Sequence, residues 1–255
     1  MRELFTMWRS TKMVVLAALT AAIYAAILIP FKGIPIIPGI TEIRPAIVVP
    51  ITFGLLFGPA GAWGSGFGNV IGDLFGGTIS LGSIFGFLGN FCFALTTYKV
   101  WGNMGPLSAH REVRLDSFRT AAEFVLVAIL ASAVCALVVA WGVDLLKMLP
   151  FTALGAIIFA NNAVGGAVLG PVLLRLIQPR VAAWHLLWTD IMDPSETSQR
   201  VSPRLGALLI WIGGLGGLLA GLALSAGLGA GATSAGVTLG VIPFLLCYLV
   251  GCLLT

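Results

Sequence analysis

Several polar side chains stand in stretches of this sequence that are otherwise apolar, and their types suit ligand binding rather than bond chemistry. They are Glu42 and Arg44 in TEIRPA, then Asn69, Asp73, Asn90, Asn161 and Asn162. A carboxylate in the middle of a membrane helix costs about 2.5–3.5 kcal/mol on insertion scales, so it normally has a partner or a task. Carboxylates, a guanidinium and amides together suit a polar heteroaromatic molecule, for example a zwitterionic one, whose identity the sequence does not give. Trp63 could add an apolar wall to such a pocket.

Patterns typical of an enzyme or a metal site do not occur in the sequence. It contains no HExxH, DDxxD or GxxxxGK[ST] pattern, and Cys92, Cys135, Cys247 and Cys252 form no CxxC pair. We therefore predict no catalytic residue, no metal, no cofactor and no nucleotide site. Asp73 and Glu42 are the candidates that an integral membrane enzyme acting on lipid would have for acid–base chemistry.

The composition of the chain points to a bilayer as its solvent. Of its 255 residues, 58% are hydrophobic and 9% are charged, against roughly 25% charged residues in an ordinary soluble domain. The mean hydropathy is +1.04. Such a chain cannot cover itself with polar surface, which excludes a soluble globule and a disordered chain. The net charge of +4 lies in connecting segments, so nucleic-acid binding is not expected.

Apolar stretches of spanning length recur along the whole chain and predict an all-α, polytopic membrane helix bundle. The stretch 65–78 is short, because at about 1.5 Å per residue it covers only about 20 Å. The predicted helices cover 13–30, 46–63, 65–78, 81–101, 119–142, 151–175, 205–224 and 237–254.

The distribution of basic residues predicts the orientation of these helices. With a cytoplasmic N-terminus, all but three of the 14 Lys and Arg residues lie inside, the exceptions being Lys32, Arg44 and Lys147. Both termini and the segment 102–118 are then cytoplasmic, and 31–45 and 143–150 lie outside. The polar residues map to the outer half of the bundle, which predicts an outward-facing pocket. We expect Arg44 to be the partner of Asp73, with Asn69 one turn away on the same helical face.

Small residues form rows at a spacing of four, which places them on one face of a helix. Such rows let another helix approach closely, either within the bundle or from a partner subunit. Two rows stand in the first helix, and a glycine row follows in the third. They are Ala17, Ala21 and Ala25; Ala18, Ala22 and Ala26; and Gly64, Gly68, Gly72 and Gly76.

The segment TEIRPAIVVPITFGLLFGPAGAWGSGFGNVIGDLFGGTISLGSIFGFLGNF (41–91) resembles the substrate-binding S components of energy-coupling-factor transporters. The alanine rows and the basic N-terminus resemble them too. The resemblance implies a six-helix protein that captures a vitamin or related micronutrient from outside, with 31–45 and 77–82 closing the pocket. It also implies that the alanine-rich first helix docks on a transmembrane coupling subunit, which two ATP-binding cassette ATPases drive.

The resemblance covers about residues 8–175, so it divides the chain. Residues 1–175 are expected to form the six-helix substrate-binding core, 176–204 a cytoplasmic linker, and 205–255 two additional transmembrane helices that exceed the six-helix pattern. VAAWHLLW (181–188) is either an amphipathic helix at the membrane interface or part of an ordinary loop. Other functions stay open: a structural or assembly protein without ligand, the lipid-modifying enzyme, and a self-sufficient channel or secondary transporter.

Overall fold

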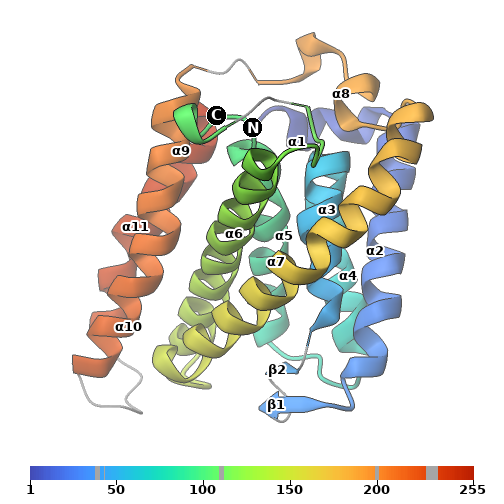
Figure 1. The fold of residues 1–255 in the computed structure, drawn as a ribbon. Coiled ribbons are helices and arrows are strands. Elements are labelled where there is room, and N and C mark those ends of the chain that lie inside the picture. Colours follow the sequence, from blue (N-terminus) through green and yellow to red (C-terminus); the bar gives the residue numbers. More distant parts are fainter. Residues whose placement is uncertain (38–40, 43, 109–111, 199–200, 228–234) are drawn as a thin grey trace.

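The computed structural model describes residues 1–255 except 38–40, 43, 109–111, 199–200 and 228–234. It is an all-α bundle of long helices, with a small two-stranded antiparallel sheet at one end (Figure 1). The helices are α1 (Glu3–Thr6), α2 (Thr11–Phe31), α3 (Val48–Phe57), α4 (Pro59–Phe75), α5 (Gly82–Val100), α6 (Phe118–Leu145), α7 (Phe151–Ala183), α8 (Trp188–Ile191), α9 (Pro203–Trp211), α10 (Gly217–Gly227) and α11 (Ala235–Leu254). A π-helical turn, Ile212–Gly216, joins α9 to α10, and the strands are β1 (Pro35–Ile37) and β2 (Thr41–Glu42).

The helices run back and forth between two ends of the bundle. Both termini, α1 and α8 lie at the end that we call the terminal end, and β1 and β2 lie at the opposite end, the hairpin end (Figure 1). Helices long and apolar enough to cross a membrane cover Thr11–Phe31, Phe118–Leu145, Phe151–Ile191, Pro203–Gly227 and Ala235–Leu254, and Pro45–Phe57 is a shorter apolar segment. Each predicted span thus has a helical counterpart, and the expected polytopic membrane bundle is confirmed.

Two predicted boundaries were wrong. The second and third helices meet at Gly58 rather than near residue 64, because Gly58 adopts φ +51° and Pro59 begins the next helix. A left-handed residue followed by proline ends one helix and starts another. The helix predicted to end at residue 175 continues to Ala183 as α7, and it contains Pro171 and Pro179. It therefore takes up the first residues of the segment expected at the membrane interface.

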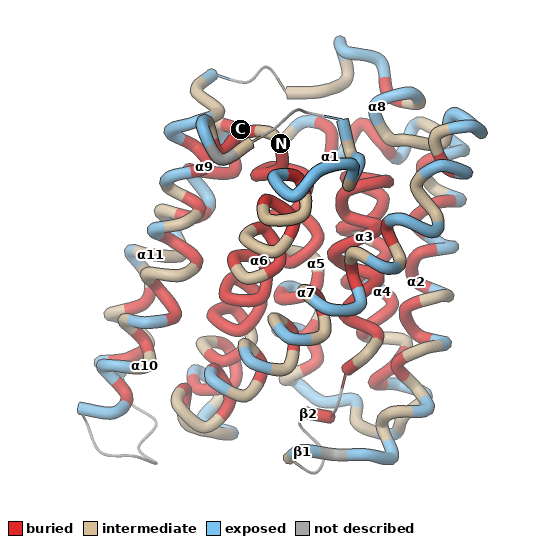
Figure 2. Tube along the Cα trace, viewed as in Figure 1, coloured by how far each residue is buried: buried red, intermediate tan, exposed pale blue. Residues whose placement is uncertain are grey.

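The centre of the bundle is built from α3, α5 and α6, where buried residues concentrate (Figure 2). On α6 nearly every residue between Val127 and Ala140 is buried. Neighbouring helices therefore surround α6 on all sides, as expected for a helix that is apolar all round. The other long helices keep one exposed apolar face, which suits contact with lipid.

Helices α2 and α4 pack unusually closely, and the glycine row of α4 makes this possible. A Cβ atom on Gly64 would lie 2.5 Å from the Ala17 carbonyl oxygen, and one on Gly68 would lie 2.8 Å from Tyr24 Cβ. The row is thus a packing surface within the bundle. As a consequence the two alanine rows of α2 separate: Ala17, Ala21 and Ala25 are buried, whereas Ala18, Ala22 and Ala26 are exposed.

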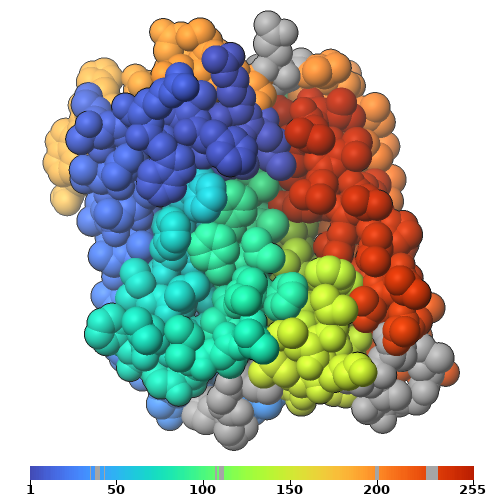
Figure 3. All heavy atoms as spheres, turned by 180° about the vertical axis from the view of Figure 1, so that it is seen from behind, coloured from blue at the N-terminus to red at the C-terminus, as the bar shows by residue number. Residues whose placement is uncertain are grey.

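The C-terminal helices α9, α10 and α11 form a helical hairpin that packs on α6. We call it the C-terminal hairpin, and it is separate from the two strands that mark the hairpin end. Close contact within it depends on Gly206 and Gly251, where a Cβ on either would lie 2.8 Å from the carbonyl oxygen of the other. Tyr248 attaches the hairpin to α5, since its hydroxyl lies 3.1 Å from Thr96 Oγ1 and donates to the Cys92 carbonyl at 3.2 Å. The C-terminal hairpin and α2 occupy opposite flanks of the bundle (Figures 1 and 3).

Candidate ligand-binding site

Polar side chains from four parts of the chain meet inside the hairpin end of the bundle. We call this group the polar cluster, and all of its side chains are buried or nearly so. Its members are Tyr24 on α2, Lys32 at the end of α2, Glu42 and Arg44 between β2 and α3, Asn69 and Asp73 on α4, and Asn90 on α5. The structure therefore brings together Glu42, Arg44, Asn69, Asp73 and Asn90, as the sequence predicted.

The charged members of the polar cluster pair with one another. Lys32 Nζ lies 2.6 Å from Asp73 Oδ1 and 3.3 Å from Glu42 Oε2, while Arg44 Nε donates to Glu42 Oε1 at 2.8 Å. Two cations thus neutralise two carboxylates in a buried site, which offsets the cost of removing them from water.

The expectation that Arg44 pairs with Asp73 was wrong. Close packing of α2 on α4 carries Lys32 to Asp73, and Gly76 leaves room for the lysine stem, because a Cβ there would lie 2.7 Å from Lys32 Cγ. Arg44 turns instead to Glu42, two residues before it. A basic residue directly after an apolar span was the sequence signal that could have pointed to Lys32.

Amide side chains continue the polar cluster toward the bundle centre. Asn69 Oδ1 accepts from Arg44 Nη1 at 3.4 Å and from Asn90 Nδ2 at 3.0 Å, and Asn69 Nδ2 donates to Asp73 Oδ2 at 3.2 Å. The Tyr24 hydroxyl donates to Asn90 Oδ1 at 2.9 Å. One chain of hydrogen bonds therefore joins α2, α4 and α5 to the charged pairs, and it fixes the rotamers of these side chains.

The two neighbouring asparagines of α7 behave differently. Asn161 Nδ2 donates to the Glu42 carbonyl at 2.8 Å and so holds β2 against α7. Asn162 is fully buried, and among the described residues neither of its amide atoms has a hydrogen-bond partner. The Cys135 thiol lies beside it, but a thiol is a weak donor and acceptor. An unpaired buried amide costs about 1–3 kcal/mol, which keeps Asn162 a candidate for pairing with a ligand.

A small cavity adjoins the polar cluster. Its walls include Arg44, Asn69 and Asp73, several residues of the segment 78–83, and Ile158 of α7. Ile158 stands one helical turn from Asn162 on the same face of α7. The cavity measures about 40 Å³, which accommodates a few water molecules. A heteroaromatic ligand would fit only after the surrounding side chains move apart.

The structure does not bring Trp63 to the polar cluster. Trp63 precedes Asp73 by ten residues on α4, which is about 15 Å along the helix. Its indole N–H donates to the Leu4 carbonyl at 2.9 Å, and its ring packs on Trp8 and Phe91. The reason is that α4 starts at the terminal end, so its first turns lie far from the hairpin end.

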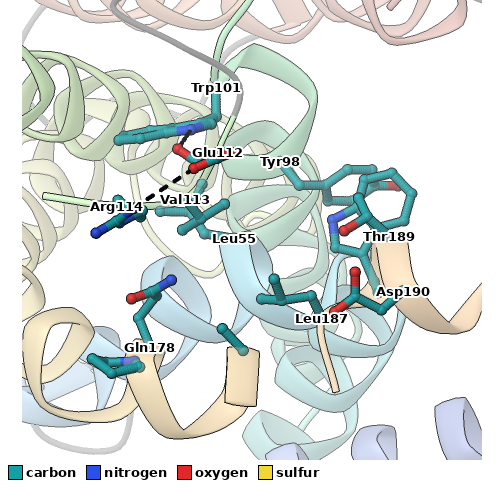
Figure 4. Close-up of a pocket in the computed structure, with 13 residues that line it drawn as sticks. Leu55, Tyr98, Trp101, Glu112, Val113, Arg114, Gln178, Leu187, Thr189 and Asp190 are labelled. Carbon is teal, nitrogen blue, oxygen red and sulfur yellow. Dashed lines mark hydrogen bonds and ion pairs between the residues drawn. The ribbon is translucent and has the colours of Figure 1, made fainter. Parts of the chain in front are cut away.

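A larger cavity, of about 680 Å³, opens at the terminal end between α5, α7 and α8 (Figure 4). Its walls include Tyr98, Trp101 and Trp188, and at its rim Arg114 lies 4.0 Å from the exposed Glu112. Trp188 covers the α3–α4 corner, because a Cβ on Gly58 would lie 2.7 Å from the indole ring. The hairpin end is the stronger candidate for a ligand site despite the smaller volume there, since the buried charges of the polar cluster line that cavity.

Comparison with known families gives one match: residues 14–179 match the family described as QueT transporter. Comparison with curated proteins and with solved structures gives no match. The matched range contains the whole polar cluster, Asn161 and Asn162, and it ends within α7. The chain therefore belongs to the QueT transporter family, whose members are membrane substrate-binding S components of energy-coupling-factor transporters and not enzymes.

Proposed function

We propose that this protein captures a queuosine precursor, a deazaguanine-type base, at the polar cluster and delivers it for uptake. Queuosine precursors are the substrates of the QueT transporter family. The observation that carries the proposal is the buried polar cluster, of which Arg44, Asn69 and Asp73 line a cavity. The unpaired amide of Asn162 lies one helical turn from Ile158, which lines the same cavity. Buried polar groups that lack partners inside the protein are the groups that a ligand can pair with.

The chemistry of such a base matches these groups. The lactam edge of a guanine-like ring presents one carbonyl acceptor beside one N–H donor, and an asparagine amide presents the complementary donor and acceptor. The exocyclic amine and ring N–H groups would be recognised by carboxylates such as Asp73 or Glu42. Asn69, Asn90 and Arg44 would complete the site, with Asn161 positioning Glu42 from behind.

The partner subunit would dock on the exposed alanine row of α2, formed by Ala18, Ala22 and Ala26. The flat surface of these residues allows another helix to approach closely. In support, the C-terminal hairpin packs on the opposite flank and leaves this row accessible (Figure 1). The partner would be the transmembrane coupling subunit, which carries two ATP-binding cassette ATPases.

The hairpin end would face outside and the terminal end the cytoplasm. The excess of Lys and Arg near the terminal end supports this orientation. The chain through Ala183, the end of α7, would then be the binding core, the segment from there to α9 a cytoplasmic linker, and α9 to α11 an added membrane hairpin. The linker is fastened to the bundle, since Thr6 Oγ1 donates to the Glu196 carbonyl at 2.8 Å and Ser198 Oγ donates to Glu3 Oε2 at 2.7 Å.

The proposal is tested with protein purified in mild detergent. Mass spectrometry of the extracted protein should detect a deazaguanine base, and calorimetry with added base should give saturable binding. Asn162→Leu should weaken that binding by about tenfold or more, because it removes the unpaired amide. Ser132→Ala removes a different buried polar group, which lies on α6, and it should leave binding of the base unchanged. A folded wild-type protein that binds no deazaguanine base would contradict the proposal and favour a structural role.

A further inference from the structure

We propose that Lys32 is an internal substitute for a cationic group of the ligand, so that the site prefers a base carrying a primary ammonium over a neutral analogue. This inference rests on the proposed function, because it concerns the same site. Lys32 would thereby determine specificity for the substituent on the ring, which would be a primary ammonium group.

The contacts of Lys32 are those of an ammonium-binding site. Its Nζ lies between two buried carboxylates, 2.6 Å from Asp73 Oδ1 and 3.3 Å from Glu42 Oε2. An ammonium group has three donors and no acceptor, so a pair of carboxylates is suited to hold it. Any other primary ammonium that reached this point would find the same two acceptors. Asp73 also lines the cavity, so such a group could reach it from there.

The balance of charge gives the second argument. With Lys32 in place, Lys32 and Arg44 balance Glu42 and Asp73. If Lys32 withdraws to admit a ligand, two buried carboxylates face Arg44 alone, and an uncompensated buried charge is strongly destabilising. A cationic ligand restores the balance, whereas a neutral one does not.

Lys32 is also the member of the polar cluster that can leave most easily. It is the C-cap of α2, and its charge sits at the tip of a flexible four-carbon stem. Arg44 is held by Glu42 and Asn69. Glu42 is held in turn at its carbonyl by Asn161. Withdrawal of Lys32 therefore requires a change of side-chain rotamer near the hairpin end, while the carboxylates stay in position.

Calorimetry with two probes tests the inference: the aminomethyl derivative of deazaguanine, which is a cation at neutral pH, and the cyano derivative, which is neutral. The wild-type protein should bind the cation about tenfold more tightly or better. Lys32→Met removes the competing ammonium and keeps the stem, so it should tighten binding of the cation several-fold and increase the preference. Asp73→Asn should bring the two affinities close together.

The controls separate this inference from the proposed function. Lys12→Met, an exposed lysine at the terminal end, should change neither affinity. If Lys32→Met does not fold, the wild-type preference and Lys32→Arg still decide, because Lys32→Arg keeps the competing cation and should keep the wild-type preference without tightening. Equal or tighter binding of the neutral probe by wild type would overturn the inference alone, whereas failure of both probes to bind folded protein would overturn the proposed function.

Discussion

The Lys32 ammonium lies 2.6 Å from the Asp73 carboxylate and joins the end of α2 to the last turn of α4. Both side chains are less than a tenth exposed. The pair thus attaches the start of the α2–α3 connection to α4, directly beside the cavity that Asp73 lines. Binding of a ligand and opening of this contact would therefore be linked.

Asp73→Asn should weaken binding of a deazaguanine base by about 1–3 kcal/mol, the usual cost of stranding a buried charged partner. Arg44→Ala should have an effect of similar size, because it removes the donor to Glu42 Oε1 and one of the two donors to Asn69 Oδ1. Calorimetry on purified protein measures both. The matched control is Asp190→Asn on α8, an exposed residue at the opposite end, which should change nothing. Unchanged affinity in both site variants would place the ligand elsewhere.

Cysteine labelling checks the orientation of the bundle. In a background without the native cysteines, Ser80→Cys at the hairpin end should react with an impermeant maleimide added to intact cells. Ser195→Cys at the terminal end should react only after the cells are opened. Both serines are exposed, so access depends on the side of the membrane. The reverse pattern would show that the hairpin end faces the cytoplasm.

Ala22→Trp should abolish transport and leave ligand binding intact, because bulk on the exposed row of α2 keeps the coupling subunit at a distance. Uptake by cells and calorimetry on purified protein separate the two effects. Ala223→Trp, an exposed alanine of α10 on the opposite flank, is the matched control and should transport normally. Normal uptake by Ala22→Trp would mean that the partner docks elsewhere.

Ala21→Leu should behave differently from Ala22→Trp. Ala21 faces α4, where a Cβ on Gly68 would lie 2.9 Å from the Ala21 carbonyl oxygen. A larger side chain in this close packing should lower the thermal stability, by about 1–3 kcal/mol for an overpacked contact, and so impair binding and transport together. A stable variant that binds but does not transport would place the docking surface on the buried row.

Gly58→Ala should destabilise the protein more than Gly77→Ala does. Both glycines have positive φ, +51° and +69°, which costs a non-glycine residue roughly 1–2 kcal/mol. At Gly77 a new Cβ meets nothing within 4 Å, whereas at Gly58 it would lie 2.7 Å from the Trp188 ring. Thermal unfolding in detergent measures the difference. Equal loss in both variants would show that Trp188 does not press on the α3–α4 corner.

The stability of the terminal end should fall in acid because of Glu3. Burial raises the pKa of Glu3, but the Lys99 ammonium at 2.7 Å and hydrogen bonds from Lys99 and Ser198 outweigh it and lower the pKa to about 2. A folded-state pKa below the unfolded value of 4.5 adds stability at neutral pH, and this stability is lost as the pH falls from 4.5 toward 2.

Thermal unfolding at several pH values checks this expectation. Glu3→Gln should be less stable than wild type at neutral pH, and the difference between them should shrink in acid. Glu112→Gln, in which the altered side chain is 76% exposed, should follow the wild-type curve. A constant difference between Glu3→Gln and wild type across the acid range would mean that the charge of Glu3 contributes nothing.

Much of this protein could be predicted from its sequence. The low content of charged residues and the recurring apolar stretches determine an all-α membrane bundle, because a bilayer leaves no other way to satisfy backbone hydrogen bonds along such stretches. The polar residues that lie at membrane depth could be named for the same reason, since each is costly there. Glu42, Arg44, Asn69, Asp73 and Asn90 do meet in one cluster.

Only the tertiary structure decided how these residues pair and which faces stay exposed. Sequence periodicity gives the spacing of residues on a helix but not the rotation of that helix against its neighbours. The rotation of α2 against α4 makes Lys32 the partner of Asp73 and buries Ala21 while Ala22 stays exposed. The position of the Gly58 corner decides that Trp63 lies near the terminal end, away from the polar cluster. These relations arise from contacts between distant segments, which no local pattern records.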